Sequence, residues 1–167
     1  MNNANLFPFE RNRYFYGKLL TVRDFEVEQR YHSGKRALLN RLVHGAGVVC
    51  GLGVTASDES TLMVESGMAL DYQGREIVLP EALFRKLQML EGQETLSGKK
   101  DAYLCLTYAE EDVEPVNATG SQAGDQRQFD LTREGYRLFL TSEAPDYRTL
   151  LEAAGRENVS VLYQSED

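Results

Sequence analysis

The sequence predicts an α+β protein in which an aromatic arm and a long helix precede a mostly antiparallel β body, with a short helix near the C-terminus. Aromatic residues crowd the N-terminus, a helix-like apolar pattern follows, and strand-like runs separated by turn residues occupy the rest. A chain of 167 residues suits one domain with its own core. We assign residues 1–20 to the arm, 21–45 to the helix and 46–167 to the β-rich body.

The arm combines aromatic and basic side chains in a segment too short to bury them by itself. These residues are Phe7, Phe9, Arg11, Arg13, Tyr14, Phe15 and Tyr16. Such side chains need a surface, which is either the body of the same chain or a partner. Tyr and Arg are also enriched at the energetic centres of protein interfaces. The composition fits self-packing and docking equally well, and the two are compatible.

The helix is predicted to begin at Thr21, because Asp24 stands three residues later in the spacing of a capping box. Gly34 is a weak point that costs about 1 kcal/mol against alanine. Gly45 and Gly47 are expected to end the helix. At 1.5 Å per residue its length is roughly 35 Å, which is long for so small a domain. Its apolar positions are Val22, Phe25, Tyr31, Ala37, Leu38, Leu42 and Val43.

The β body is predicted from short apolar runs that alternate with turn residues. We expect its first strands at 48–54, 62–65, 69–72 and 76–79. Gln73 and Gly74 fit a tight hairpin turn between the last two of these strands. Pro80 closes this block, and residues 81–100 fit either a short helix or an edge strand followed by turns.

The second half of the body is predicted to be a strand pair separated by a long segment. Strands are expected at 102–108 and 135–141, paired across a polar loop at about 110–128. A structureless loop of this length is uncommon in a compact domain, so we expect it to be flexible or functional. Residues 146–154 are predicted to form the short C-terminal helix, followed by a polar tail.

The composition excludes several classes of function. The net charge of −8 argues against nucleic-acid binding, which needs a basic surface to displace phosphate counterions. No apolar run approaches the roughly 20 residues of a membrane span. The N-terminus lacks the pattern of a signal peptide, so cytoplasmic synthesis is expected. Cys50 and Cys105 lie in apolar runs and are predicted to be buried free thiols rather than a disulfide framework.

Catalytic and metal-binding patterns are weak in this sequence. His32 and His44 stand twelve residues apart on the predicted helix, roughly 18 Å along its axis, and cannot share a site within it. A nucleophilic pair of His44 with Cys50 is disfavoured because an apolar context raises a thiol pKa. The carboxylates of Glu110, Glu111, Asp112 and Glu114 lack calcium-loop spacing, and a solvated loop is favoured. The glycine run 45–51 follows a helix, which is the wrong order for a dinucleotide site. We therefore predict no enzyme, cofactor or metal.

Residues 11–54 carry a resemblance to a known group of proteins. The stretch RNRYFYGKLLTVRDFEVEQRYHSGKRALLNRLVHGAGVVCGLGV resembles the N-terminal segment of bacterial proteins that accompany phage-tail-like gene sets, including contractile injection systems. The following VESGMALDYQGREIVLP is similar to a short β motif of tail and baseplate-associated proteins, here Gly67, Ala69, Gly74, Arg75, Glu76, Ile77 and Pro80. The later TYAEEDVEPV and REGYRLFLTSEAP are also similar to this group. The resemblance implies a structural or attachment role, in many copies per particle, of the baseplate or tail-fibre type.

The function expected from these observations is assembly. The arm and helix would bury apolar surface against other protein subunits, so that the chain forms a homo- or hetero-oligomer within a virion-like or released particle. The predicted interface residues are Phe7, Phe9, Arg11, Arg13, Tyr14, Phe15, Tyr16, Phe25 and Tyr31. The alternative is a small carbohydrate- or ligand-binding β domain that uses the 110–128 loop. An enzyme that gathers His44, Cys50 and a carboxylate is a third reading.

Overall fold

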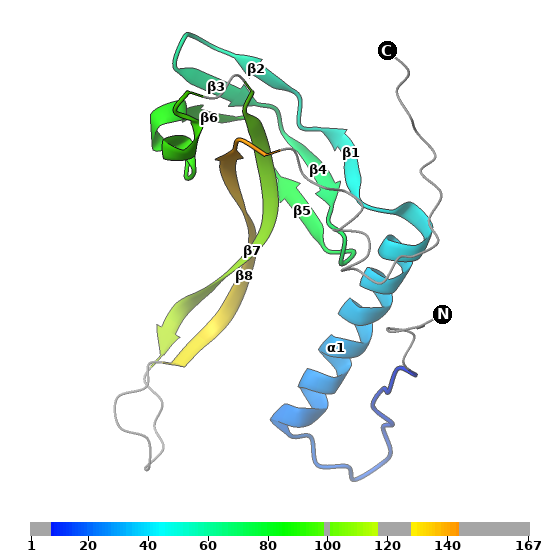
Figure 1. Cartoon of the computed structure of the whole chain (residues 1–167). Helices are drawn as coiled ribbons and strands as arrows, with labels where there is room; N and C mark the ends of the chain where they lie inside the picture. Colours follow the sequence, from blue (N-terminus) through cyan, green and yellow to red (C-terminus); the bar gives the residue numbers. More distant parts are fainter. Residues whose placement is uncertain (1–7, 99–100, 117–127, 144–167) are drawn as a thin grey trace. The chain divides into compact units, whose positions relative to one another are not determined.

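A computed structural model describes residues 8–98, 101–116 and 128–143, and its secondary structure is that of an α+β protein. One long helix is followed by antiparallel strands, as Figure 1 shows, so the predicted fold class is correct. The chain divides into two compact units. The described part of the first comprises residues 8–46 and 72–74, and that of the second comprises the β strands. The predicted C-terminal helix at 146–154 and Phe7 lie outside the described residues.

The helix α1 spans Val22–Leu39 and continues into a π-helical turn, Asn40–His44. The predicted start is correct, because Thr21 precedes the first helical residue and forms a capping box with Asp24. The predicted end is also correct. Gly45 adopts a φ of 85° beyond the last turn, and its N–H donates to the carbonyl of Asn40 at 2.9 Å. In the same unit, the side-chain amide of Asn40 donates to the carbonyl of Gly74 at 3.0 Å.

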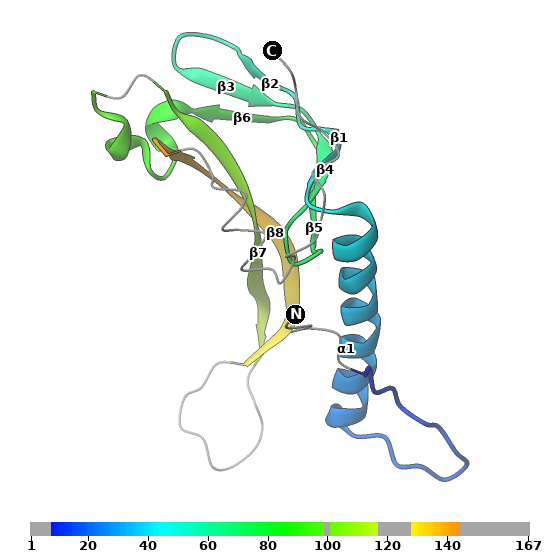
Figure 2. The ribbon, with the colours of Figure 1, turned by 45° about the vertical axis from the view of Figure 1, so that its right-hand side comes forward.

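The second unit is built on a three-stranded antiparallel meander that bends in the middle. Its two halves are the sheet β1–β4–β5 and the sheet β2–β3–β6. The strands are β1 (Gly47–Gly51), β2 (Val54–Ala56), β3 (Thr61–Val64), β4 (Gly67–Leu70), β5 (Glu76–Leu79) and β6 (Leu83–Lys86). The pairs Val54–Val64 and Gly51–Gly67 share one register across the bend. The two sheets are therefore halves of one bent meander, visible in Figures 1 and 2.

The bend is the main departure from the predicted strands. Residues 48–54 were expected to form one strand, but the chain breaks between β1 and β2 because Gly51 and Leu52 both take positive φ, 61° and 59°. Backbone hydrogen bonds to the segment between β3 and β4 continue through the break. The N–H of Leu52 donates to Ser66 at 3.3 Å, and the N–H of Glu65 donates to Gly53 at 2.8 Å.

The hairpin that joins β4 to β5 turns at Tyr72 and Gln73, and Gly74 follows with a φ of 82°, so the turn lies one residue before the predicted Gln73 and Gly74. Asp71 and Arg75 close it from both sides. The carboxylate of Asp71 accepts from the backbone N–H of Arg75 at 2.8 Å and from its Nε at 2.6 Å. Beyond this hairpin, residues 83–86 form β6, so the edge-strand reading of residues 81–100 is correct there. Two short 3-10 turns follow, at Leu87–Met89 and Gln93–Leu96.

A long two-stranded ribbon completes the second unit. It consists of β7 (Tyr103–Val116) and β8 (Gln128–Thr141). The predicted pairing of 102–108 with 135–141 is correct, but the predicted loop at 110–128 is wrong at both ends. Residues 110–116 and 128–134 continue the ladder, as in the pair Val113–Leu131. The sequence prediction failed because both segments are polar, and the backbone hydrogen bonds of a ribbon do not require apolar side chains.

The core of the second unit lies on the middle and third strands of the meander. Ile77 and Leu79 are each 2% exposed, whereas Val78 between them is 52% exposed. This alternation is the signature of a strand with one buried face. The remaining buried apolar residues are Val64, Ala69, Leu70, Leu90 and Leu140. The chain around Leu140 is fixed further by its N–H, which donates to the carbonyl of Glu91 at 2.8 Å.

Replacing Gly51 with alanine should destabilise the second unit more than the same change at Gly98. Both glycines have positive φ, which costs an alanine about 1–2 kcal/mol. A Cβ at Gly98 meets nothing within 4 Å, whereas one at Gly51 would collide with the backbone of Ser66 and Gly67. Urea unfolding should show a loss of about 1–2 kcal/mol for Gly98→Ala and a clearly larger loss for Gly51→Ala. Equal losses would contradict the close approach of the strands at the bend.

Candidate assembly surface

The segment before α1 presents its aromatic side chains on a tight turn. The N–H of Lys18 donates to the carbonyl of Phe15 at 3.1 Å, which closes a four-residue turn. Gly17 occupies the third position with a φ of 82°, where a type II turn requires glycine. Tyr16, at the second position, is fully exposed, and Phe15 and Tyr14 are 65% and 59% exposed. The turn therefore places three adjacent aromatic side chains in solvent.

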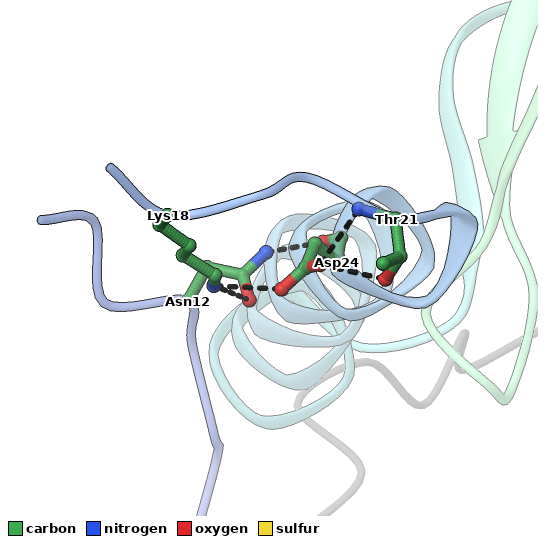
Figure 3. Close-up of polar contacts among 4 residues, drawn as sticks. All are labelled: Asn12, Lys18, Thr21 and Asp24. Atoms are coloured by element: carbon green, nitrogen blue, oxygen red, sulfur yellow. Dashed lines mark hydrogen bonds and ion pairs between the residues drawn. The ribbon is translucent and has the colours of Figure 1, made fainter. Parts of the chain in front are cut away.

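A polar cluster fastens this turn to the first turn of α1, as Figure 3 shows. Asp24 is its centre. Its Oδ1 lies 2.6 Å from Nζ of Lys18, and its Oδ2 accepts from the backbone N–H and the hydroxyl of Thr21 at 2.9 and 2.7 Å. The side-chain amide of Asn12 donates to the carbonyl of Asp24, and Lys18 donates to Asn12 at 3.4 Å. Asn12, Lys18, Thr21 and Asp24 are called the latch below.

The latch stabilises the ionised form of the Asp24 carboxyl group relative to the protonated form. The ammonium of Lys18 and the hydroxyl and N–H of Thr21 hold the pKa of the Asp24 carboxyl well below its ordinary range. A carboxylate in the first turn of a helix is also stabilised by the positive end of the helix dipole. The latch should therefore remain formed at every pH at which the carboxyl group is ionised.

A second attachment point lies two turns further along the helix. The ring of Phe9 meets the ring of Tyr31 edge to face, with centroids 6.4 Å apart, and Nζ of Lys35 lies 5.2 Å from the Phe9 centroid. Phe9 occupies the space that a side chain at position 34 would fill, because a Cβ on Gly34 would lie 2.9 Å from Cε1 of Phe9. The predicted weak point of the helix is therefore the notch that receives Phe9.

These contacts cover only one side of the helix. Half-buried positions follow helical spacing at Asp24, Val27, Tyr31, Gly34 and Leu38, and residues 9–12 lie against several of them. Among the described residues, none of α1 or of its π-helical turn is fully buried. A helix of this length normally gains its stability by burying an apolar face. Within the described residues, several of its other apolar positions, such as Val22, Phe25 and Leu39, are exposed.

The exposed apolar residues of this unit gather near the start of the helix. Val22 is 74% exposed and Phe25 is 59% exposed, close in sequence to the aromatic turn. Further along, Leu39, Leu42 and Val43 are also exposed. We call the first group the aromatic surface, and it consists of Tyr14, Phe15, Tyr16, Leu19, Leu20, Val22 and Phe25.

The predicted interface residues divide into two sets. Phe9 and Tyr31 pack on each other and so belong to the attachment of the segment to its own helix. Tyr14, Phe15, Tyr16 and Phe25 belong to the aromatic surface, and Arg11 and Arg13 are exposed. The roles of Asn12 and Lys18 were missed from the sequence. Asp24 was recognised only as a capping residue, because sequence spacing reports contacts within the helix and not contacts with the preceding segment.

The other side chains singled out from the sequence form no such cluster. His32 lies 3.1 Å from the carboxylate of Glu28 on the same helix, one turn away. Cys50 is exposed on β1, so the prediction of burial is wrong for it. Cys105 is half-buried, and burial raises the pKa of its thiol. Within residues 8–98, 101–116 and 128–143, no three His, Cys, Asp or Glu residues are placed to hold a metal ion.

The acidic part of β7 has one notable contact. The hydroxyl of Tyr108 donates to Glu110 at 2.8 Å, and the guanidinium of Arg75 lies 4.4 Å from the Tyr108 ring centroid. Desolvation of the phenol, followed by the nearby carboxylates, raises the Tyr108 pKa far above its ordinary value. Tyr108 is therefore a neutral hydrogen-bond donor that joins the ribbon to the β4–β5 hairpin.

Comparisons with known proteins add no assignment to this surface. No protein-family model matches the chain, and no curated protein matches it at a significant level. Among the described helices, none has the length and apolar character needed to cross a membrane.

Replacing Lys18 with methionine should raise the pKa of the Asp24 carboxyl towards its ordinary value near 3.8. In the wild type the folded pKa lies below the unfolded one, so the latch contributes stability above the unfolded pKa and loses it as pH falls through the folded pKa. NMR titration of the side-chain carboxyl measures this shift directly. Arg30→Met, on the same helix, is the control and should leave the titration unchanged. An unaltered titration in Lys18→Met would disprove the latch.

Replacing Gly34 with alanine should stabilise the helix less when Phe9 is present than when Phe9 is replaced with alanine. In a Phe9→Ala chain the change should stabilise the helix by about 1 kcal/mol, because alanine is the better helix former. With Phe9 present, the new methyl group displaces its ring and much of this gain is lost. Unfolding followed by the helical circular dichroism signal completes the double-mutant cycle. The same gain in both backgrounds would show that Phe9 does not occupy the notch.

Proposed function

We propose that the chain is a non-enzymatic structural or adaptor component of a phage-tail-like particle, and that it assembles with other protein subunits through its N-terminal segment and α1. The observation that carries the proposal is the aromatic surface. Three adjacent aromatic side chains stand in solvent on a turn beside a helix with no fully buried residue among those described. Large contiguous apolar surfaces on a soluble protein mark interaction sites.

The latch supports this proposal because it makes the surface preorganised. An interface loop that is already held in its bound conformation loses less entropy on association. Lys18 and Asp24 fix the end of the aromatic turn, and Phe9 fixes the segment that precedes it. The exposed aromatic side chains therefore lie on a turn held at both sides. Tyr and Phe also lose few rotamers when they are buried by a partner.

The particle itself is proposed from the resemblance of residues 11–54 to proteins that accompany phage-tail-like gene sets. The ligand-binding alternative loses part of its support, because residues 110–116 belong to a strand and not to the binding loop that it required. The proposal concerns assembly, and we assign no catalytic residue, cofactor or metal to it.

Replacing all three of Tyr14, Phe15 and Tyr16 by serine should prevent incorporation of the chain into particles, while the helix content of the chain stays unchanged. None of the three makes a latch hydrogen bond through its side chain, but the centroid of the Tyr14 ring lies 5.5 Å from Nζ of Lys18. The double variant Phe15→Ser with Tyr16→Ser, which keeps this contact, should therefore show the same loss. The measurement is the amount of chain that sediments with particles from the producing cells. Deletion of residues 1–20 is a less specific variant, because it also removes Phe9, Asn12 and Lys18.

Phe84→Ser is the matched control, since Phe84 is 59% exposed on β6 in the other unit. It should leave sedimentation unchanged. Undiminished incorporation of the triple serine variant would contradict the proposed function. Both variants should keep the wild-type circular dichroism spectrum, which separates a lost interface from a lost fold.

A further inference from the structure

Three exposed arginines, Arg11, Arg13 and Arg23, lie around the latch and are called the arginine cluster below. The side-chain amide of Asn12 donates to the carbonyl of Asp24, a contact that Figure 3 shows. Two of the arginines adjoin Asn12 in sequence, and the third adjoins Asp24. The latch therefore brings three positive charges into one region, next in sequence to members of the aromatic surface.

The arginine cluster has no carboxylate partner within the described part of the chain. The latch carboxylate, on Asp24, pairs with Lys18, its Oδ1 lying 2.6 Å from Nζ. The exposed carboxylates of Glu10 and Glu26 stand nearby in sequence, but among the described residues neither forms an ion pair with the cluster. Like charges in one region repel each other, and an opposite charge nearby relieves this repulsion. An anionic group from another molecule would therefore stabilise the cluster.

The charge of the chain is divided unevenly along its sequence. Residues 1–46 contain eight basic and four acidic side chains, which gives them a net charge of +4. Because the whole chain carries −8, residues 47–167 carry −12. An acidic chain thus has one basic segment, which holds both the arginine cluster and the aromatic surface. A partner that meets this segment should be acidic, since complementary charge favours association.

An extended polyanion fits this division of charge poorly. A nucleic acid or an anionic bilayer carries negative charge over its whole length or area, so it would also repel the −12 of residues 47–167. A protein can instead present a few carboxylates only where the arginines meet it. Arginine forms paired hydrogen bonds with carboxylates, and protein interfaces combine an apolar centre with a polar rim. A local acidic patch on a protein therefore fits both the cluster and the aromatic side chains.

The β7–β8 ribbon of this chain is acidic, but it does not offer such a patch. Side chains alternate between the two faces of a strand pair. The pair Glu110–Glu134 therefore lies on the opposite face from the pair Val113–Leu131. Its carboxylates do not border the apolar side chains that would cover an aromatic surface. A different protein is the better match for the arginine cluster.

We propose that the partner of the aromatic surface is an acidic patch on a different protein of the assembly, whose carboxylates pair with the arginine cluster and whose apolar centre covers the aromatic side chains. This inference rests on the proposed function and names the chemistry of its partner. The arginine cluster then decides which protein is selected, because like charges across an interface are strongly disfavoured. The association should weaken as salt rises, since salt screens exposed charge pairs.

Charge reversal tests the arginine cluster. Arg11→Glu with Arg13→Glu should lower incorporation into particles at least about tenfold, because the new carboxylates repel those of the partner. The amount of chain that sediments with particles measures this loss. Arg85→Glu with Lys86→Glu, exposed on β6, is the matched control, because it changes the total charge equally, and it should leave incorporation unchanged. Both variants should keep the wild-type circular dichroism spectrum.

A charge-conserving variant identifies the partner groups directly. Arg11→Lys with Arg13→Lys keeps both charges, so it should enter particles far better than the reversed variant, and it supplies amines for cross-linking. A carbodiimide couples an amine to a carboxylate that touches it. Mass spectrometry of treated particles should show links from positions 11 and 13 to Asp or Glu side chains of a different protein. Links only to this same sequence, or no links in particles that contain the variant, would overturn the inference.

The remaining outcomes separate this inference from the proposed function. Wild-type incorporation of the reversed variant would overturn the acidic partner, and so would an equal loss in the control, which would make total charge the cause. Binding of the purified chain to vesicles of phosphatidylserine and phosphatidylcholine, or to double-stranded DNA, that the reversed variant loses would assign the cluster to a polyanion instead. If the triple serine variant still fails to enter particles, the proposed function stands without this partner. Undiminished incorporation of the triple serine variant would contradict both.

Discussion

The architecture of the β unit depends on the close backbone approach of two glycines, Gly51 and Gly67, where the meander bends. They face each other in adjacent strands, and a Cβ on either would collide with the backbone of the other strand. The bend divides the same three strands into two sheets. The pairing of the first and middle strands keeps one register across the bend, whereas that of the middle and third strands shifts by one residue. It also turns the middle strand so that Val64 and Leu70, on either side of the bend, are both buried.

The helix obeys a different constraint, because it is long and yet buries no residue completely among those described. Its contacts with residues 9–18 come from a few specific interactions, the Phe9 notch and the latch. These interactions fix the direction of the preceding segment more than they bury apolar area. The apolar side chains that the described residues of this helix and turn leave exposed are suited to packing on another subunit, which is the physical basis of the proposed function.

The exposed surfaces of the two units differ in kind. In the first unit, aromatic side chains are exposed close in sequence to Arg11 and Arg13. In the second unit, Phe129 and Leu131 are exposed on one face of the β7–β8 ribbon, whereas Asp112 and Thr132, which form a hydrogen bond, lie on the other face.

The sequence by itself determined the features that depend on neighbours in the chain. The capping pair Thr21 and Asp24 and the end of the helix at Gly45 follow from local backbone chemistry and were predicted. The hairpin turn was predicted to within one residue. The α+β class followed from the change in apolar periodicity after the helix. The acidic segment at 110–116 was misjudged because its polarity resembles that of a loop, whereas the ladder with 128–134 decides its conformation.

Only the tertiary structure decided the contacts between residues distant in sequence. The sequence indicated only that Gly34 weakens the helix, whereas the structure shows that the ring of Phe9 packs against it. The ion pair of Lys18 with Asp24 was likewise not predicted from the sequence. The split of residues 48–54 into two strands depends on the neighbouring strand at Gly67, which no local pattern reveals. The aromatic arm was visible in the sequence, but which of its side chains pack inward and which remain exposed depends on the notch and the latch. Their long-range contacts, such as Lys18 with Asp24 and Phe9 with Gly34, join residues that lie 6 and 25 positions apart and are brought together only by the fold.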